Sequence, residues 1–445
     1  MIRMAANRSR FVRRTVLSAF LVLATMWTVV VSPVGADQRF VVRTTGLQAL
    51  NTGCLIAVCT VQYALDGGAG QLFLVTTSDS VNPQTFLTGL LSQVGIVDAE
   101  LDYVVRTLGA VAAAAPPGLY DRTPVDYYGS AVWHGYVAQP AAARVALGDA
   151  QHSFGLTGQG VTVAVIDTGV DADHPVLRGV VTDGYDFTRN WARGSERNDV
   201  NVSWDGQSNA SAWQVNQSTM VILDQSTMVI LDSPDLAAFG HGTMVAGVIH
   251  LVAPQATILP LKAFRADGSG YSSDVLRAIY YAIHNGAKVL NMSFSYPEPS
   301  QELGRALDAA ASGGLLAIGS AGNTGQHVAA YPAALSNVIG VASTNDSDVL
   351  SQFSNYGADF FLLAAPGEAI VSTYPFGTYA AAWGTSFSAP FAAGTAALLA
   401  QLAPSIDQGQ AAAAVGHAVP VDGVARGRLD VFRAVNSRMC SPSCP

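Results

Sequence analysis

Three short motifs supply an acid, an imidazole and a hydroxyl that could act together. Asp167 lies in Ile-Asp-Thr-Gly, His241 in Gly-His-Gly-Thr and Ser386 in Gly-Thr-Ser. A serine becomes a nucleophile when an imidazole takes its proton and a carboxylate orients that imidazole. Asp167 alone would be explained equally well as a turn or helix-cap aspartate, and Ser386 alone would be explained better as a helix N-cap. Together they predict acyl transfer through a Ser-His-Asp triad.

The surrounding pattern predicts how these residues are positioned. Apolar strands of parallel-sheet type are expected at 161–166, 258–263, 288–292, 315–318 and 338–341, with helices between them. Asp167 would then lie at the carboxyl end of a strand, where open parallel sheets gather functional residues. His241 and Ser386 would each lie where a helix begins, and free N–H groups there favour negative charge. The predicted fold is α/β, a parallel sheet with helices on both faces.

At these motifs the chain resembles the subtilisin-like serine proteases (the subtilase family, peptidase S8 type), over about residues 130–435. The resemblance implies that Asp167 orients His241, that His241 is the general base and then acid, and that Ser386 is the nucleophile. It also implies an oxyanion-hole asparagine, which matches Asn323 in Ser-Ala-Gly-Asn. Without the resemblance, Asn323 would be interpreted as a turn residue.

The resemblance further implies that substrate backbone adds as a strand between two edge segments. The matching residues are Gly268, Ser269 and Gly270 in one segment and Ser293, Phe294 and Ser295 in the other. Ser295 and Tyr296 stand where the family commonly has two glycines, which predicts a narrower pocket for the residue before the cut.

No cofactor is expected, because the family's usual calcium site is predicted to be absent. Val176 follows His174-Pro175 where the family has an aspartate, and residues 248–254 leave no room for the calcium-binding loop. An alternative is a cation cluster, which we disfavour because hard-cation sites need converging oxygens. Its members would be Asp171, Asp173, His174, Asp183 and Asp186.

The N-terminus predicts export. Five arginines, the apolar run 15–31 and Val-Gly-Ala at 34–36 are typical of a secretory signal peptide ending at residue 36; a retained membrane anchor is the alternative. Removing those five positive charges changes the formal net charge from −9 to −14. This acidity argues against a nucleic-acid partner. We expect a secreted protein, extracellular or periplasmic, with no membrane contact after signal cleavage.

The predicted domains follow from shifts in pattern. Residues 37–108 form a small α+β unit, with strands at 40–45, 59–65, 72–77 and 96–106 and a helix after Asn82, which resembles the family's inhibitory prodomain. A linker at 109–135, the catalytic domain at 136–437 and a tail at 438–445 complete the chain.

Two smaller features stand apart from the triad. Cys54 with Cys59 and Cys440 with Cys444 are close pairs that predict local disulfides in an oxidising compartment. Residues 217–224 and 225–232 are an exact tandem repeat of Gln-Ser-Thr-Met-Val-Ile-Leu-Asp. The repeat is either a duplicated pair of β-segments inside an insertion or a substrate-facing or self-associating hairpin.

The functional prediction is a secreted serine endopeptidase that cleaves protein or peptide substrates through an acyl-enzyme. It would be made as a self-processing proenzyme, with its own prodomain as intramolecular inhibitor. Two alternatives stay open on the sequence alone: a peptide ligase or cyclase with the same triad, and a catalytically inactive binding homologue. The second is disfavoured because Asp167, His241, Ser386 and Asn323 fill all four chemical positions.

Overall fold

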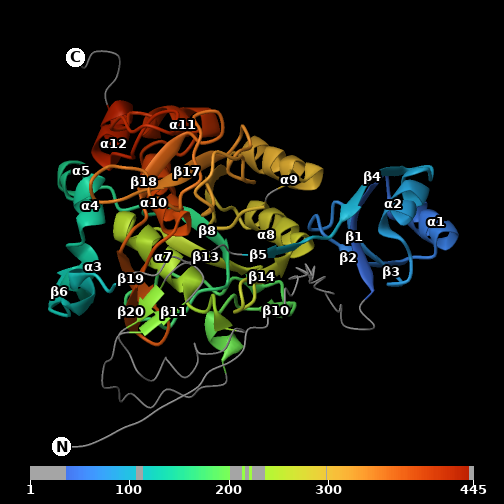
Figure 1. Cartoon of the computed structure of the whole chain (residues 1–445), viewed down its shortest axis with the longest axis horizontal. Coiled ribbons are helices and arrows are strands. Elements are labelled where there is room, and N and C mark those ends of the chain that lie inside the picture. Colours follow the sequence, from blue (N-terminus) through green and yellow to red (C-terminus); the bar gives the residue numbers. More distant parts are fainter. Residues whose placement is uncertain are drawn as a thin grey trace, which may run out of the picture.

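The computed structural model describes residues 37–106, 114–200, 236–296 and 298–439, together with the backbone of 213–215 and 220–222. They form a large α/β domain and a small α+β unit beside it (Figure 1). The predicted signal peptide and the pair Cys440 and Cys444 lie outside the described residues. None of the described helices is long and apolar enough to cross a membrane.

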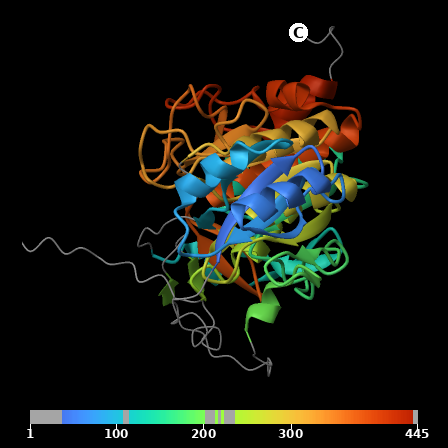
Figure 2. The same cartoon turned by 90° about the vertical axis from the view of Figure 1, so that its right-hand side faces the viewer.

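The small unit is a four-stranded sheet with two helices on its outer face, away from the large domain (Figure 2). Its sheet order is β2-β3-β1-β4. The elements are β1 (Gln38–Thr44), α1 (Leu47–Ala57), β2 (Thr60–Ala64), β3 (Leu72–Thr77), α2 (Pro83–Leu91) and β4 (Ile96–Leu101). Helix α2 begins as the sequence predicts, because Asn82 Oδ1 accepts a hydrogen bond from Thr85 N at 3.0 Å.

Helix α1 was not expected from the sequence. It follows Gly46, has no side-chain cap and carries no charge in its first or last turn, so the usual helix signals are missing. Burial of Leu50 and Cys54 against the small sheet holds the helix in place. The disulfide Cys54–Cys59 then ties its end to the start of β2, which confirms the predicted local bridge.

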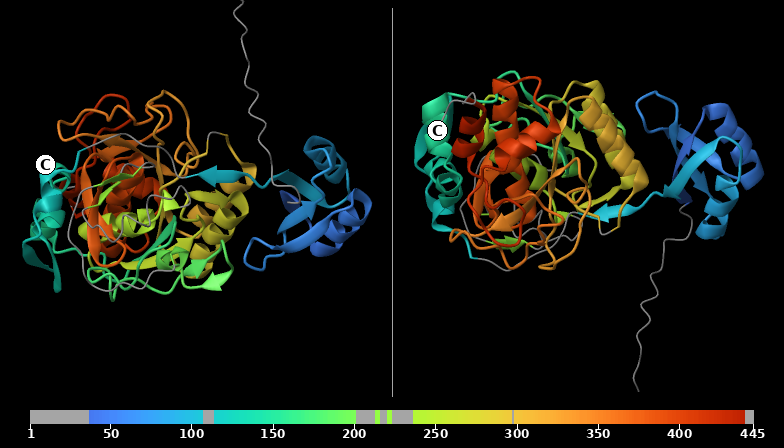
Figure 3. Two further views of the ribbon diagram at one scale, coloured as in Figure 1. Left: turned by 60° about the horizontal axis from the view of Figure 1, so that its bottom comes forward. Right: turned by 90° about the horizontal axis from the view of Figure 1, so that it is seen from above.

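The strand expected at 96–106 is two strands. β4 belongs to the small sheet, whereas β5 (Val104–Arg106) pairs antiparallel with β14 (Ser269–Tyr271) of the large domain. Figure 3 shows β5 reaching from the small unit to the large domain. The strand breaks at Asp102, whose buried carboxylate accepts hydrogen bonds from Ser272 and Ser273 of the large domain as well as from Arg39 of β1.

The large domain is built on an eight-stranded sheet of order β10-β9-β13-β8-β15-β16-β17-β18. Its strands are β8 (Thr162–Asp167), β9 (Tyr185–Asp186), β10 (Trp191–Ala192), β13 (Thr257–Lys262), β15 (Val289–Met292), β16 (Leu316–Ser320), β17 (Ile339–Thr344) and β18 (Leu363–Pro366). All neighbours pair in parallel except β9 and β10. The five predicted strands and the α/β class are confirmed.

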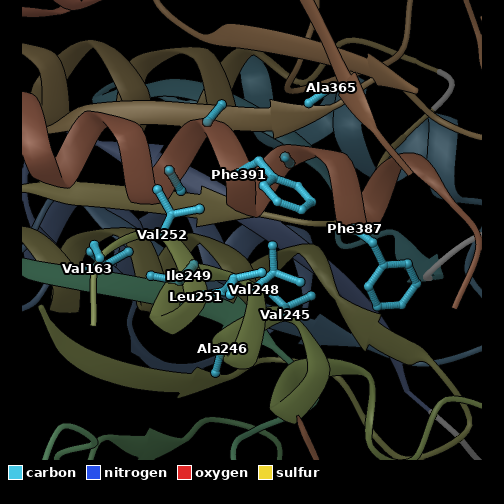
Figure 4. Close-up of a cluster of buried hydrophobic side chains, with 14 of the residues drawn as sticks. Val163, Val245, Ala246, Val248, Ile249, Leu251, Val252, Ala365, Phe387 and Phe391 are labelled. Atoms are coloured by element: carbon cyan, nitrogen blue, oxygen red, sulfur yellow. The ribbon is translucent and has the colours of Figure 1, made fainter. Parts of the chain in front are cut away.

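Helices cover both faces of this sheet. The side chains of β8 show this, because they alternate between two core clusters. Val163 and Val165 belong to the core cluster under α7 (His241–Val252) and α10 (Thr385–Leu402). Ala164 and Ile166 belong to the cluster under α8 (Ser272–His284) and α9 (Gln301–Ser312). Figure 4 shows the first cluster, with Phe387 and Phe391 of α10 above the valines of α7. The fold therefore holds α7 and α10 side by side on one face.

The remaining helices lie near the ends of the large domain. They are α3 (His134–Val137), α4 (Pro140–Arg144), α5 (Leu147–Phe154), α11 (Gln408–Val415) and α12 (Val431–Met439). A second sheet, of order β11-β12-β20-β19, contains β11 (Trp213–Val215), β12 (Met220–Ile222), β19 (Ile370–Tyr374) and β20 (Thr378–Ala382). Strand β12 comes from the first copy of the tandem repeat, while the second copy lies outside the described residues.

The prediction of a linker at 109–135 is wrong for much of its length, because the described part is folded. It contains a short 3-10 turn, η1 (Pro117–Tyr120), and a hairpin of β6 (Pro124–Tyr127) and β7 (Ser130–Trp133). Leu119 and Val132 are buried in the core of the large domain. Proline, glycine and tyrosine suit a hairpin as well as a linker, so composition misled the prediction.

The crossing of α7 and α10 generates a stability prediction. Phe391 is fully buried there, so we expect Phe391→Ala to lower the free energy of unfolding by about 3–5 kcal/mol. Guanidinium unfolding would be followed by tryptophan fluorescence in a Ser386→Ala background, to avoid self-digestion. Val349→Ala, at an exposed position, is the control and should change stability by less than about 0.5 kcal/mol. Equal effects of the two substitutions would contradict the proposed core.

Candidate active site

Asp167 and His241 meet where a strand ends and a helix begins. His241 Nδ1 lies 2.7 Å from Asp167 Oδ1, and both side chains are buried. The approach depends on glycine, because a Cβ at Gly242 would lie 2.1 Å from the carbonyl oxygen of Gly169. At Gly240, where φ is +89°, a Cβ would lie 2.0 Å from the Tyr374 ring. The glycines around His241 thus allow the close approach that the sequence predicts.

The environment of His241 makes it more basic. Burial lowers the pKa of the imidazole, but the Asp167 charge, its hydrogen bond and the Glu196 charge outweigh burial and leave the pKa above 6.5. Among the described residues no hydrogen-bond partner is found for His241 Nε2. The ring lies 5.2 Å, centroid to centroid, from Phe387, the neighbour of Ser386. The imidazole therefore faces the start of α10.

Ser386 is fixed by reciprocal hydrogen bonds with Ser293, just after β15. Ser386 Oγ donates to the Ser293 carbonyl at 3.1 Å, and Ser293 Oγ donates to the Ser386 carbonyl at 2.8 Å. Pro390 explains the second bond: it has no N–H, so the carbonyl four residues earlier lacks its helical donor. The hydroxyl proton of Ser386 is thus directed to Ser293, while the ring of the next residue, Phe387, lies against His241. Active-site hydrogen bonds are often made only when substrate binds.

Asn323 follows β16 and is oriented by Thr385. Its Oδ1 accepts hydrogen bonds from Thr385 N at 2.9 Å and Thr385 Oγ1 at 2.8 Å. Since the oxygen is held by Thr385, the amide NH2 group points to the other side of the carboxamide. Asn323 therefore lies beside Thr385, the residue before Ser386, with its amide oxygen turned toward the start of α10.

The predicted substrate edges are partly occupied by the small unit. Ser269 pairs with Arg106 and Gly270 with Val105 in the β14–β5 ladder, and Val105 is buried. Gly268 forms the preceding turn, with φ at +80°. On the second edge, Ser295 and Tyr296 line an apolar groove together with Val105 and Thr324. Phe294, between Ser293 and Ser295 in the chain, is buried in the α8–α9 core cluster.

The small unit also contacts two helix N-termini of the large domain. Asp102 accepts hydrogen bonds from Ser273 N and Ser273 Oγ, both at 2.8 Å, at the start of α8. Glu100 accepts a 2.6 Å hydrogen bond from Ser300, which itself caps α9. Both carboxylates lie where the helix dipole favours negative charge. These contacts align β5 with β14.

Three charged residues near the site were missed from the sequence. Lys262 is fully buried, and its Nζ donates to Asp199 Oδ2 at 2.8 Å and to the carbonyls of Thr168 at 2.6 Å and Phe264 at 2.7 Å. A lysine inside an apolar strand, in a chain with only two lysines, was an available signal. Asp199 and Glu196 lie on a short 3-10 turn and carry no sequence signal.

The five residues considered as a cation cluster are held separately. Asp171 and Asp173 face Arg197, and His174 Nε2 lies 2.9 Å from the Thr378 carbonyl. Burial lowers the pKa of His174 to about 4. Asp183 pairs with Arg193 and Asp186 with Arg189. Within the described ranges no three His, Cys, Asp or Glu side chains converge on one point that could hold a metal ion.

The parallel sheet, the Asp167–His241 pair and the serine at the start of α10 define a subtilisin-like architecture. The family model of peptidase S8, described as the subtilase family, matches residues 158–428. Thermitase from Thermoactinomyces vulgaris is 33% identical over 297 residues, which cover 62% of this chain and 89% of thermitase. Subtilisin BL from Lederbergia lenta is 34% identical over 265 residues, or 58% of this chain and 82% of the relative.

A solved structure shows the same fold. Fervidolysin from Fervidobacterium pennivorans, a keratinolytic enzyme related to subtilisin, matches with a TM-score of 0.68 at 20% identity. The match covers 90% of this chain and 61% of the fervidolysin chain. The chain belongs to the subtilase family, whose named relatives make it a serine-type endopeptidase.

The buried ion pair behind the site generates a prediction. Lys262→Met would leave the Thr168 and Phe264 carbonyls without their donor and Asp199 with Arg189 as its remaining cationic partner, so the free energy of unfolding should fall by about 3–5 kcal/mol. The other lysine, Lys288, is half-buried and donates only to backbone carbonyls. Lys288→Met should therefore cost about 1 kcal/mol. Denaturant unfolding compares the two; a smaller loss at Lys262 than at Lys288 would contradict the assignment.

Proposed function

We propose that this chain cleaves peptide bonds through Ser386 as nucleophile, His241 as general base and acid, and Asp167 as the carboxylate that orients His241. The observation that carries the proposal is the 2.7 Å contact between His241 Nδ1 and Asp167 Oδ1. It leaves Nε2 to take the Ser386 proton and later to protonate the leaving amine. Asn323 and the backbone N–H of Ser386 would donate to the oxyanion of the tetrahedral intermediate.

The N-terminal unit is proposed to be an inhibitory prodomain. Support comes from β5, which occupies β14, the edge on which a substrate strand would add. Self-cleavage would then fall after β5, between the unit that pairs with β14 and the catalytic domain. The mature enzyme would begin before the hairpin β6–β7, because that hairpin is buried against the catalytic core.

Export is part of the same proposal. The signal-like residues 1–36 directly precede β1, so their removal would leave the prodomain intact. The Cys54–Cys59 disulfide fits an oxidising compartment outside the cytoplasm. Substrates would be extracellular or periplasmic proteins and peptides.

Parallel expression of wild type and Ser386→Ala tests nucleophile and maturation together. We expect Ser386→Ala to accumulate with residues from Asp37 onward, whereas wild type releases a fragment of roughly 70–87 residues, which ends between Arg106 and the hairpin that begins at Pro124. Ser388→Ala, a buried serine one half-turn later in α10, is the matched control and should mature normally. Mass analysis of both product ends separates hydrolysis from ligation. Equal cleavage of Ser386→Ala in a protease-free host would refute self-processing, and retained peptidase activity would refute the nucleophile.

The basic His241 generates a pH prediction. The imidazole must be neutral to accept the serine proton, and its pKa lies above 6.5, so kcat/KM should fall as pH drops through a value higher than 6.5. Asp167→Asn removes the charge that raises this pKa, and the remaining activity should have its acid limb at lower pH. Initial rates on one peptide between pH 5 and 10 measure the acid limb of wild type and that of Asp167→Asn. Full wild-type activity at pH 5 would disprove the assigned base.

The predicted lack of the family's calcium site generates a chelator prediction. Val176 replaces the ligand aspartate and is buried, so EDTA should change the melting temperature of the Ser386→Ala protein by less than about 2 °C. Thermal unfolding with EDTA, and again after calcium is restored, makes the measurement. A large calcium-reversible drop would reveal a cation site that we have not assigned.

A further inference from the structure

Glu196 is a second buried carboxylate behind the Asp167–His241 pair. It begins a short 3-10 turn and is completely inaccessible to solvent. Its Oε1 accepts hydrogen bonds from Gly240 N at 3.1 Å and Gly242 N at 3.2 Å. Its Oε2 accepts from Thr243 N at 3.2 Å and Thr243 Oγ1 at 2.5 Å. The donors immediately precede and follow His241 in the chain.

These contacts supply the cap that α7 lacks. Gly240 occupies the N-cap position and has no side chain, so the first N–H groups of the helix need acceptors from elsewhere. Glu196 provides them with a full negative charge at the positive end of the helix dipole. Because His241 is the first residue of α7, the position of its imidazole depends on this contact.

The hydroxyl of Thr168 links the two carboxylates. Thr168 Oγ1 lies 3.2 Å from Asp167 Oδ1, and it also makes a very short hydrogen bond with Glu196 Oε1. One hydroxyl proton serves one acceptor, so Thr168 can donate to Glu196 or to Asp167 but not to both. With the proton donated to Glu196, Asp167 Oδ1 keeps two donors, His241 Nδ1 and Thr168 N, each at 2.7 Å. Removing the Glu196 charge would free the Thr168 proton to bond to Asp167. Asp167 would then attract the protonated imidazole of His241 less strongly.

The charged groups around His241 also favour its protonated form. Carboxylates Asp167 and Glu196 act on it directly, while the buried cation Lys262 is paired with Asp199 and also acts on Glu196. On the far side, Asp171 faces Arg197. The other titratable group against Glu196 is Tyr374, whose hydroxyl donates to the Phe239 carbonyl. Burial raises the pKa of Glu196 to about 7, so the carboxylate is ionised in the alkaline range.

We propose that Glu196 is a positioning residue for the peptidase reaction: it fixes the first turn of α7 and adds a negative charge that makes His241 a stronger base. The inference rests on the proposed triad. Glu196 touches no substrate and acts only through His241 and Thr168.

The test is the pH profile of kcat/KM for matured Glu196→Gln. The substitution keeps the shape but loses the charge, and its NH2 group faces N–H donors. We expect the acid limb to move down by about 0.5–1 pH unit, and kcat on the plateau to fall about tenfold with little change in KM. Glu196→Asp keeps the charge and should restore the wild-type acid limb.

Asp430→Asn is the matched control. Asp430 is also a buried carboxylate at a helix N-terminus, accepting a 2.9 Å hydrogen bond from Arg433 N at the start of α12, far along the chain from the triad. It should lower the melting temperature without moving the acid limb. If Glu196→Gln lowers the melting temperature but leaves the acid limb of kcat/KM where it is in wild type, the proposal is overturned. Glu196 would then be only a structural cap of α7.

The experiment distinguishes failure of the proposed triad from failure of the proposed role of Glu196, and it allows for a variant that does not fold. Wild type without Ser386-dependent turnover would refute the triad itself, whereas an active wild type with an unmoved Glu196→Gln limb refutes only the role of Glu196. If Glu196→Gln does not mature, Glu196→Asp decides. A wild-type acid limb with kcat reduced about tenfold supports positioning through geometry, and an unchanged kcat overturns it.

Discussion

The contact between the first turn of α7 and the carboxyl end of β8 is the constraint on which the site depends. Gly242 can lie against the Gly169 carbonyl only because it has no Cβ, and this approach brings His241 Nδ1 to 2.7 Å from Asp167 Oδ1. Lys262 donates a hydrogen bond to the Thr168 carbonyl from within the sheet and so anchors the end of β8. With strand and helix fixed, α10 completes the site by presenting Ser386 against Ser293.

Helix N-termini recur around this site, and each receives a different partner. Glu196 caps α7 from within the large domain, while Asp102 and Glu100 reach α8 and α9 from the small unit. At α10 the side-chain oxygen of Asn323 accepts from Thr385, one residue before Ser386. The same dipole physics therefore acts behind His241, where the small unit docks, and at the start of α10, where the proposed nucleophile Ser386 lies.

Much of the fold and of the candidate site was predictable from the sequence, because hydrophobic periodicity and motif spacing are local signals. The parallel strands, the cap at Asn82 and the Cys54–Cys59 bridge follow from them. The α1 helix did not, since it lacks caps and charges and is stabilised by burial alone. The division of the strand at Asp102 and the place of Glu196 depend on partners more than forty residues away, which no local pattern encodes.

The most direct test of the central claim is to label the nucleophile. The matured protein is treated at pH 8 with a sulfonyl fluoride, a reagent that sulfonylates activated serine hydroxyls, and the modified peptide is located by mass spectrometry. The account predicts one adduct per chain, on Ser386, with loss of peptidase activity in proportion to labelling, and much slower labelling when the isolated residues 37–106 are added back. Labelling of another residue, or full activity after complete labelling of Ser386, would contradict it.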